Sequence, residues 1–361
     1  MNKRPMSEEH KQKIREGLAR RKKEKEESRI IDPGIAKIKD IKLTPQDVKN
    51  LRLLRARKTL PGFVEHVLRD MNGSKVKNAV HQIAWWEHFK YCTKIRKTTV
   101  ILAPMAHAKT NWIAIALPLW LLGQNENLRI MMVSSAEKIA TERLKVIGDY
   151  IKRSEAYHEL FPWVTPDESS EWNSNRINIK RRAQDGGMVG SVNASVSAYG
   201  YTSREGIGAR SDILIFDDVI DDINSRNPAG RETLKSLVET QWITRGEPVP
   251  ILDRWGSVLS DDQIHVVVGT RYNPEDWYGT CLAQPHAYCT MIQAISQDFN
   301  GIDCTIIGSN ETPEHPMYTK YKDSPIIKRS EYDDYFAAMD AAKQDSTLVV
   351  DDSVVNQPTV T

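Results

Sequence analysis

Three short segments of this chain combine the residue types that phosphate chemistry uses. The first, residues 102–111, reads LAPMAHAKTN and ends in Lys109 and Thr110. Where such a loop joins a strand to a helix, its backbone N–H groups and the positive end of the helix dipole converge on an anion. We expect Lys109 to reach the β- and γ-phosphates of a nucleotide and the Thr110 hydroxyl to ligate Mg²⁺.

This loop departs from the usual GxxxxGK[ST] pattern, because Ala103 and Ala108 stand where glycines are usual. An alanine at a positive φ costs about 1 kcal/mol, and a loop that requires no positive φ could tolerate both alanines. Taken alone, the segment also fits an ordinary helix N-terminus with an exposed lysine. The residues expected to contact the nucleotide here are Pro104, Met105, Ala106, His107, Ala108, Lys109 and Thr110.

The second segment, residues 211–218, is the apolar run SDILIFDD, which ends in two adjacent carboxylates. At the C-terminal end of a strand the chain bends, so both Asp217 and Asp218 can approach a ligand beside the phosphate loop. We expect Asp217 to hold Mg²⁺ through water and Asp218, as the catalytic residue, to orient and polarise the attacking water. Glutamate is more usual at this catalytic position, and Asp218 could instead cap the next helix.

The third segment, residues 265–276, reads HVVVGTRYNPED, a strand that ends in a polar turn. Thr270 could contact the γ-phosphate, with Gly269 and Arg271 coupling that contact to a DNA-gripping surface. A strand followed by an ordinary turn and a helix fits equally well. The order of the three segments favours the first interpretation, because it is the order expected in a RecA-like sheet whose strand ends face one nucleotide.

The elements that must position these residues alternate along the chain. Short β-branched or apolar runs at 98–102, 128–133, 212–216 and 264–268 predict strands, and helical periodicity predicts helices at 109–122 and 136–152. This alternation predicts an α/β fold, a RecA-like P-loop NTPase whose mainly parallel sheet is flanked by helices. We also predict helices at 45–58 and 61–71, and an antiparallel pair of 176–180 with 188–192.

The remaining organisation follows from composition. Residues 1–30 hold eleven Lys or Arg against six Glu and almost nothing apolar. This composition predicts either a flexible basic arm that binds a nucleic-acid backbone or a solvated tail. A small helical N-terminal part at 31–75 and a P-loop ATPase domain at 76–290 are expected to follow. Residues 291–361 are expected to be a linker or subdomain remnant with an acidic tail.

Composition also excludes some classes. A net charge of +2 with 40% hydrophobic residues is typical of an ordinary globular protein, and no apolar run is long enough to cross a membrane. The four cysteines form no CxxC pair and have no histidine at zinc-finger spacing, so we expect neither a metal site nor a disulfide framework. A soluble, intracellular protein with reduced thiols is expected.

Together the three segments resemble the ATPase domain of tailed-phage large terminases. LAPMAHAKT is similar to their variant phosphate loop, GIGARSDILIFDDVID to their acidic motif and VVVGTRYNPEDWYG to their coupling motif. The run that begins His81-Gln82 lies where the family contacts the adenine. The resemblance covers residues 60–285 and rests on all three motifs rather than on any one.

The resemblance implies an ATP- and Mg²⁺-dependent motor that translocates double-stranded DNA into a procapsid. Its implied partners are a portal protein, a small terminase subunit and further copies of the chain in a ring. The implied location is the host cytoplasm, transiently docked on the procapsid and away from any membrane. Such rings use an arginine reaching into the neighbouring site. Arg143 matches that position best, and Arg210 and Arg271 are alternatives.

Two other functions stay open. A helicase or recombination ATPase shares the expected fold, and a DNA- or protein-binding module could carry an inactive nucleotide site. The inactive-site alternative draws support from Ala103, Ala108 and Asp218. Large terminases usually add a nuclease domain, but residues 286–361 contain no run of strands ending in carboxylates. We therefore expect no DNA cleavage by this chain.

Overall fold

The computed structural model describes residues 44–105, 107–183, 186–187, 190–206, 208–295 and 302–307. The predicted basic arm, Ala106 and the acidic tail lie outside the described residues. The chain divides into two units, Met1–Leu51 and Arg52–Thr361. The sheet and the candidate site belong to the second unit.

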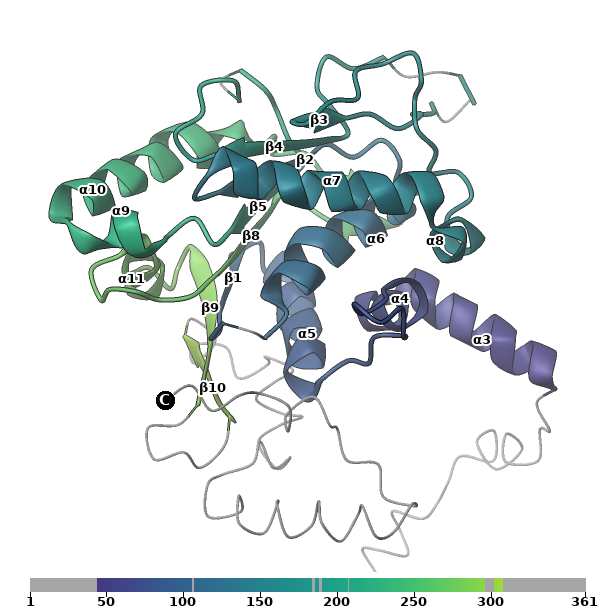
Figure 1. Cartoon of the computed structure of the whole chain (residues 1–361), viewed down its shortest axis with the longest axis horizontal. Coiled ribbons are helices and arrows are strands. Elements are labelled where there is room, and N and C mark those ends of the chain that lie inside the picture. The colour runs from purple at the N-terminus through teal and green to yellow at the C-terminus, as the bar shows by residue number, and fades with distance from the viewer. Residues whose placement is uncertain are drawn as a thin grey trace, which may run out of the picture. The chain divides into compact units, whose positions relative to one another are not determined.

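The second unit is built on an eight-stranded sheet in the order β10-β9-β1-β8-β5-β2-β4-β3 (Figure 1). The six strands from β9 to β4 are parallel, and each edge carries an antiparallel strand. This confirms the predicted α/β fold with a mainly parallel central sheet. The strands are β1 (Thr98–Leu102), β2 (Ile130–Ser134), β3 (Arg176–Ile177), β4 (Val196–Gly200), β5 (Ile213–Asp217), β8 (Ile264–Gly269), β9 (Tyr288–Ile295) and β10 (Ile302–Ile307). A separate hairpin joins β6 (Ile251–Leu252) to β7 (Val258–Ser260).

Helices flank the sheet on both faces. The helices of the described residues are α3 (Pro45–Lys58), α4 (Leu60–Val67), α5 (Val80–Lys94), α6 (Leu117–Gln124), α7 (Glu137–Arg153), α8 (Glu155–Leu160), α9 (Asp222–Arg226), α10 (Pro228–Leu237) and α11 (Trp277–Ala283), and those from α4 onward belong wholly to the unit that holds the sheet. The predicted helix 109–122 divides into a π-helical segment, Thr110–Ala116, and α6. In the part of the chain that the structure covers, no helix has the length and apolar character needed to span a bilayer.

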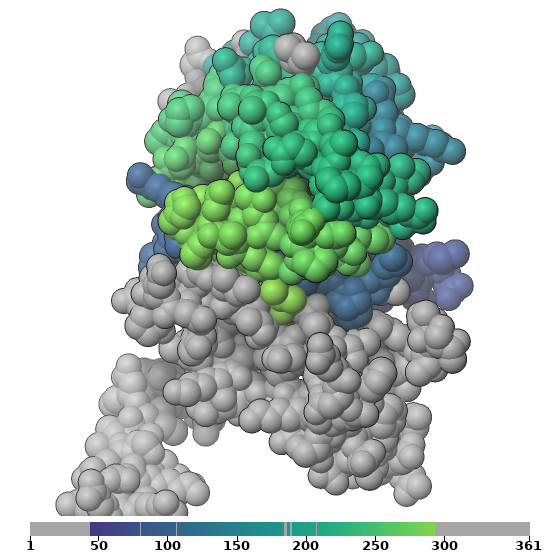
Figure 2. Space-filling model, turned by 90° about the vertical axis from the view of Figure 1, so that its left-hand side faces the viewer, coloured from purple at the N-terminus to yellow at the C-terminus, as the bar shows by residue number. Residues whose placement is uncertain are grey.

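Successive residues of the central strands pack into two separate cores. On β5, Ile213 and Ile215 join the core shared with α4 to α8, while Leu214 and Phe216 join the core shared with α10 and α11. All five residues of β5 are buried, as expected where helices cover both faces of a parallel strand. Figure 2 shows the outer side of the helices that cover the second of these cores. The green residues of α9 and α10 lie above the yellow-green residues of α11 and β9.

Three expectations about elements were wrong. The predicted pairing of 176–180 with 188–192 does not form: β3 pairs with β4, and Gly190–Val192 lie outside any strand. Val192 is fully exposed whereas every residue of β4 is buried, so β4 is the partner that buries apolar surface. The predicted helix 61–71 ends at Val67, because the backbone becomes extended at Leu68 and then turns back so that Arg69 bridges Lys75.

The third difference concerns the end of the predicted ATPase domain at residue 290. β9 crosses that position, and β10 pairs with it antiparallel, so the sheet continues to Ile307. The region assigned to a linker therefore contributes an edge strand to the same sheet.

Candidate functional site

The three predicted segments meet at one edge of the sheet because their strands are neighbours in register. Leu102 of β1 pairs with Gly269 of β8, and Val268 of β8 pairs with Asp217 of β5. The loops that follow these strands therefore emerge together, at the carboxyl ends where parallel sheets bind their ligands. The structure thus places Lys109, Thr270 and Asp217 in one site.

Lys109 turns back across its own loop. Its Nζ donates to the carbonyl oxygens of Ala103 and Pro104, each at 2.9 Å, and to the Thr270 hydroxyl at 2.7 Å. The side chain is 5% exposed, and this burial lowers the pKa of Lys109, while the carboxylates of Asp218 and Asp217 oppose the shift. The ammonium group is therefore held at the junction of β1, β5 and β8.

The two alanines of the loop differ in backbone conformation. Ala108 has a φ of 57°, in the left-handed region, whereas Ala103 is not among the described residues with positive φ. The loop therefore does require a positive φ, at Ala108, so the condition under which both alanines would be tolerated without strain is not met. The left-handed alanine costs about 1 kcal/mol, which the surrounding structure must offset.

The same loop offers donors to a ligand. Among the described residues, the backbone N–H groups of His107, Ala108 and Lys109 have no hydrogen-bond acceptor. Thr110 follows as the first, half-buried residue of the π-helical segment. Consecutive N–H groups around a left-handed residue form a concave site suited to an anion.

Asp217 is the most buried acid at this edge. It is 1% exposed, its Oδ2 lies 3.4 Å from Nε of Arg143, and its Oδ1 has no hydrogen-bond partner in the described part of the chain. Burial and then the charge of Asp218 raise the pKa of Asp217 to about 6, against the opposing effect of Arg143. A buried carboxylate oxygen without a partner is costly, and a cation there would relieve that cost.

Asp218 lies just beyond the strand, with a φ of 45°. Its N–H still donates to the carbonyl of Val268 at 3.0 Å, and burial raises the pKa of its carboxyl group. The helix-capping alternative is wrong, because the cap of α9 is Asp221, whose Oδ1 accepts from Ile223 and Asn224. Asp218 is therefore left at the site edge rather than at the start of α9.

The three candidate arginines differ in position. Arg143 of α7 forms its ion pair with Asp217 of the same chain. Arg210 donates to the Thr244 carbonyl at 3.0 Å, and Arg271 donates to the Pro274 carbonyl at 3.1 Å within its own turn. Of the three, Arg143 is the one in contact with the acidic pair among the residues described, which favours a role within its own subunit.

The start of α5 lies beside the loop that carries His107 and Lys109. The ring of His81 is 5.3 Å from that of His107, between centroids. The neighbouring Gln82 is buried, and its Oε1 accepts from the N–H of Ala79 at 2.9 Å, so this side chain caps its own helix. Met105 is 63% exposed at the tip of the loop and supplies no charge there.

Sequence reasoning missed Ser134 at this edge. It ends β2 and pairs in register with Asp217, and its Oγ is buried with no hydrogen-bond partner among the residues described. The available signal was a polar residue directly after the apolar run 128–133. Ser134 and Asp217 therefore add two unpartnered oxygens to the site.

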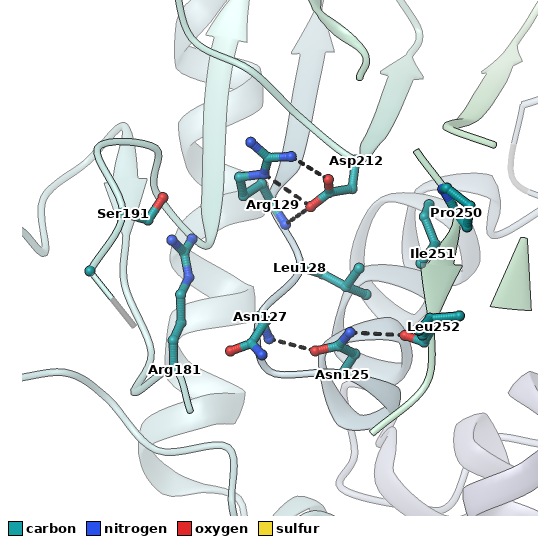
Figure 3. Close-up of a pocket in the computed structure, with 11 residues that line it drawn as sticks. Asn125, Asn127, Leu128, Arg129, Arg181, Ser191, Asp212, Pro250, Ile251 and Leu252 are labelled. Atoms are coloured by element: carbon teal, nitrogen blue, oxygen red, sulfur yellow. Dashed lines mark hydrogen bonds and ion pairs between the residues drawn. The ribbon is translucent and has the colours of Figure 1, made fainter. Parts of the chain in front are cut away.

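A polar pocket of about 340 Å³ lies at the opposite edge of the sheet, where β2 and β5 begin (Figure 3). Arg129 bridges the two strands through Asp212, with Nε at 3.1 Å from Oδ2, and also pairs with Glu247 at 2.7 Å. Arg181 enters the pocket from the loop that carries Ser191. This pocket is separate from the residues around Lys109, and its charges chiefly tie the strand ends together.

Comparisons with known proteins add little to this geometry. No protein-family model matches the sequence, and no curated protein matches it. Among solved structures, the chain is similar to the crystal structure of the HK97 bacteriophage large terminase, with a TM-score of 0.42 and 11% sequence identity. The match covers 64% of this chain and 41% of the terminase chain. At this similarity, function rests on the site itself.

Proposed function

We propose that the site binds ATP with Mg²⁺ and hydrolyses it, and that the chain is the ATPase of a viral DNA-packaging motor. One observation carries the proposal: Lys109, Thr270 and the carboxylates of Asp217 and Asp218 converge where three neighbouring parallel strands end. A buried lysine beside two buried acids and a strained loop is costly for a fold without a ligand.

The residues divide the chemistry among themselves. Lys109 would exchange its loop carbonyls for phosphate oxygens, and the N–H groups of His107 and Ala108 would donate to the same anion. Thr110 and Asp217 would hold Mg²⁺, which neutralises charge on the β- and γ-phosphates. Phosphoryl transfer depends mainly on positioning and on charge stabilisation, which a buried site strengthens.

The catalytic step would use the groups around β5 and β8. Asp218 would orient the attacking water, and Arg143 would stabilise charge on the transferring group once the metal occupies Asp217. The hydroxyl of Thr270 now bonds both Lys109 and the Ala103 carbonyl, at 2.7 and 3.2 Å. Entry of a γ-phosphate would break this pair of contacts. Arg271, the next residue in the chain, would transmit the change to the DNA-gripping surface.

The motor assignment rests on the resemblance of the three motifs to large terminases. It proposes double-stranded DNA as the translocated substrate, with a portal protein and a small terminase subunit as partners. The chain would work as a homo-oligomeric ring in the host cytoplasm, docked on the procapsid during packaging. ATP and Mg²⁺ are the proposed cofactors of that cycle.

Steady-state ATP hydrolysis tests the enzymatic part. We expect Mg²⁺-dependent turnover that falls by about 100-fold or more in Lys109→Ala and in Asp218→Asn, because each removes charge or water positioning used in the transition state. Lys97→Ala is the matched control, since Lys97 contacts the Pro285 carbonyl at the other end of β1. Unchanged turnover in both site variants would exclude this site as the catalytic one.

An inactive nucleotide site is the second candidate, and the left-handed Ala108 favours it. The strained loop could bind a nucleotide without completing the chemistry. That function requires nucleotide binding by the wild-type chain without turnover, even with double-stranded DNA present. Turnover that depends on Asp218 would reject it.

A further inference from the structure

A second cluster of reactive side chains lies within the core, between α5 and β9. His88 and Cys92 are one helical turn apart on α5, and Cys289 lies on β9. One ligand atom from each lies within 4.8 Å of the others, and all three residues are 0% exposed. Motif spacing does not predict a metal site here, because nearly two hundred residues separate Cys92 from Cys289.

The spacing of these atoms suits a tetrahedral metal ion. Sγ of Cys92 lies 3.7 Å from Nδ1 and 3.6 Å from Nε2 of His88. Zinc bonds to nitrogen at about 2.0–2.1 Å and to sulfur at about 2.3 Å, so two such ligands at a tetrahedral angle are about 3.5–3.6 Å apart. Because Sγ is about equally far from both ring nitrogens, it lies off the lone-pair axis of Nδ1, so an ion bound to both atoms requires a different rotamer of Cys92.

The orientation of the histidine ring supports the same conclusion. Nε2 of His88 lies 3.0 Å from the carbonyl oxygen of Cys289. A carbonyl oxygen can only accept, so Nε2 carries the proton and Nδ1 keeps the lone pair that a metal needs. Metal-binding histidines commonly have this second hydrogen bond to a backbone carbonyl, which fixes the tautomer and the ring.

An oxygen donor lies beside the two sulfurs. Thr99 of β1 is the register partner of Cys289 and is 1% exposed. The cluster thus combines two sulfurs, one imidazole nitrogen and a neighbouring hydroxyl. Thiolate and imidazole ligands in tetrahedral geometry select zinc over harder cations such as Mg²⁺.

We propose that His88, Cys92 and Cys289 bind one Zn²⁺ ion, with Thr99 beside the fourth position, and that this ion fastens α5 to β9. Binding converts both thiols to thiolates and releases their two protons, so the ion and its ligands are together neutral. The site is structural, because its ligands are buried. It would anchor the helix whose first turn carries His81 against His107 of the phosphate loop.

Metal analysis of the full chain, purified without chelators, tests this proposal. We expect about one zinc per chain, retained in Cys281→Ser and lowered at least tenfold in Cys92→Ser and in Cys289→Ser. Cys281 is the matched control, because it is also a buried free thiol but lies on α11, in the other core. Cobalt substitution should give a thiolate-to-metal charge-transfer band that the same two variants lose.

Two outcomes would overturn the proposal. One is wild-type protein that carries no zinc and shows no cobalt–thiolate band when cobalt is added to the reduced chain. The other is zinc that persists in both cysteine variants, which would place the ion elsewhere. Should those variants fail to fold, the cobalt spectrum of the wild-type chain decides alone. The result is independent of ATP hydrolysis, so it can fail without affecting the nucleotide site.

Discussion

Two non-glycine residues at the proposed nucleotide site have left-handed backbone conformations, Ala108 at φ 57° and Asp218 at φ 45°. Each costs of order 1 kcal/mol or more, and residues of this kind cluster where function fixes the backbone. Ala108 turns the loop ahead of Lys109, and Asp218 redirects the chain at the end of β5. The sequence motif showed where Lys109 and Asp218 would lie, but residue types alone could not show which alanine would be strained.

Replacing Ala108 by glycine tests this strain. We expect Ala108→Gly to raise the free energy of unfolding by up to about 1 kcal/mol, because glycine adopts positive φ without the Cβ clash. Chemical denaturation of the nucleotide-free chain measures the change. Ala229→Gly, at an exposed position in the first turn of α10, is the control and should be neutral or destabilising. A loss of stability in Ala108→Gly equal to that of the control would contradict the strain argument.

At the scale of elements, the sequence predicted the strands that end at the candidate site better than the strands toward the edges of the sheet. β1, β5 and β8 are short apolar runs followed by polar residues, so both their existence and their shared edge could be predicted. β4 has the mixed sequence VSAYG and was missed, although all its residues are buried against neighbours. Its burial is set by β2 and α7, which no local pattern reveals.

The buried cysteine and histidine cluster could not be predicted for a related reason. His88 and Cys92 show helical spacing, but two ligands on one helix do not define a metal site. Cys289 lies near these two side chains only because β9 pairs with β1 and packs against α5. Long-range strand pairing, rather than motif spacing, brings these residues together.

The buried side chain of His265, on β8, makes the free energy of unfolding depend on pH. Burial lowers the pKa of His265 to about 4, below its ordinary value of 6.5. The unfolded chain therefore binds more protons than the native chain between these values, and stability falls as pH drops through that window. Between pH 7 and pH 5 the contribution of this one group is about 2 kcal/mol.

The variant His265→Leu isolates this contribution. We expect the loss of unfolding free energy between pH 7 and pH 5 to be smaller in the variant by about 2 kcal/mol, whatever its absolute stability. Denaturant titrations at the two pH values measure the difference. Equal pH dependence in both proteins would show that His265 is not held neutral in the folded chain.

At the scale of the whole molecule, a net charge of +2 conceals a basic N-terminal segment and an acidic C-terminal one. Residues 1–30 hold eleven of the basic side chains and lie outside the described residues. If they contact a nucleic-acid backbone, each neutralised phosphate releases counterions and steepens the salt dependence of binding. We expect deletion of residues 1–30 to weaken double-stranded DNA binding and to flatten its salt dependence. An unchanged slope would identify the segment as a solvated tail.

The central claim is that the edge where β1, β8 and β5 end is a nucleotide site, and equilibrium binding of ATP with Mg²⁺ tests it most directly. Calorimetric titration of the full chain should give one site whose affinity requires Mg²⁺. We expect Lys109→Ala to abolish that binding and Lys97→Ala to leave it unchanged, since only Lys109 lies beside Asp217, Asp218 and Thr270. Absence of binding to the wild-type chain, or equal affinity in both variants, would contradict the account.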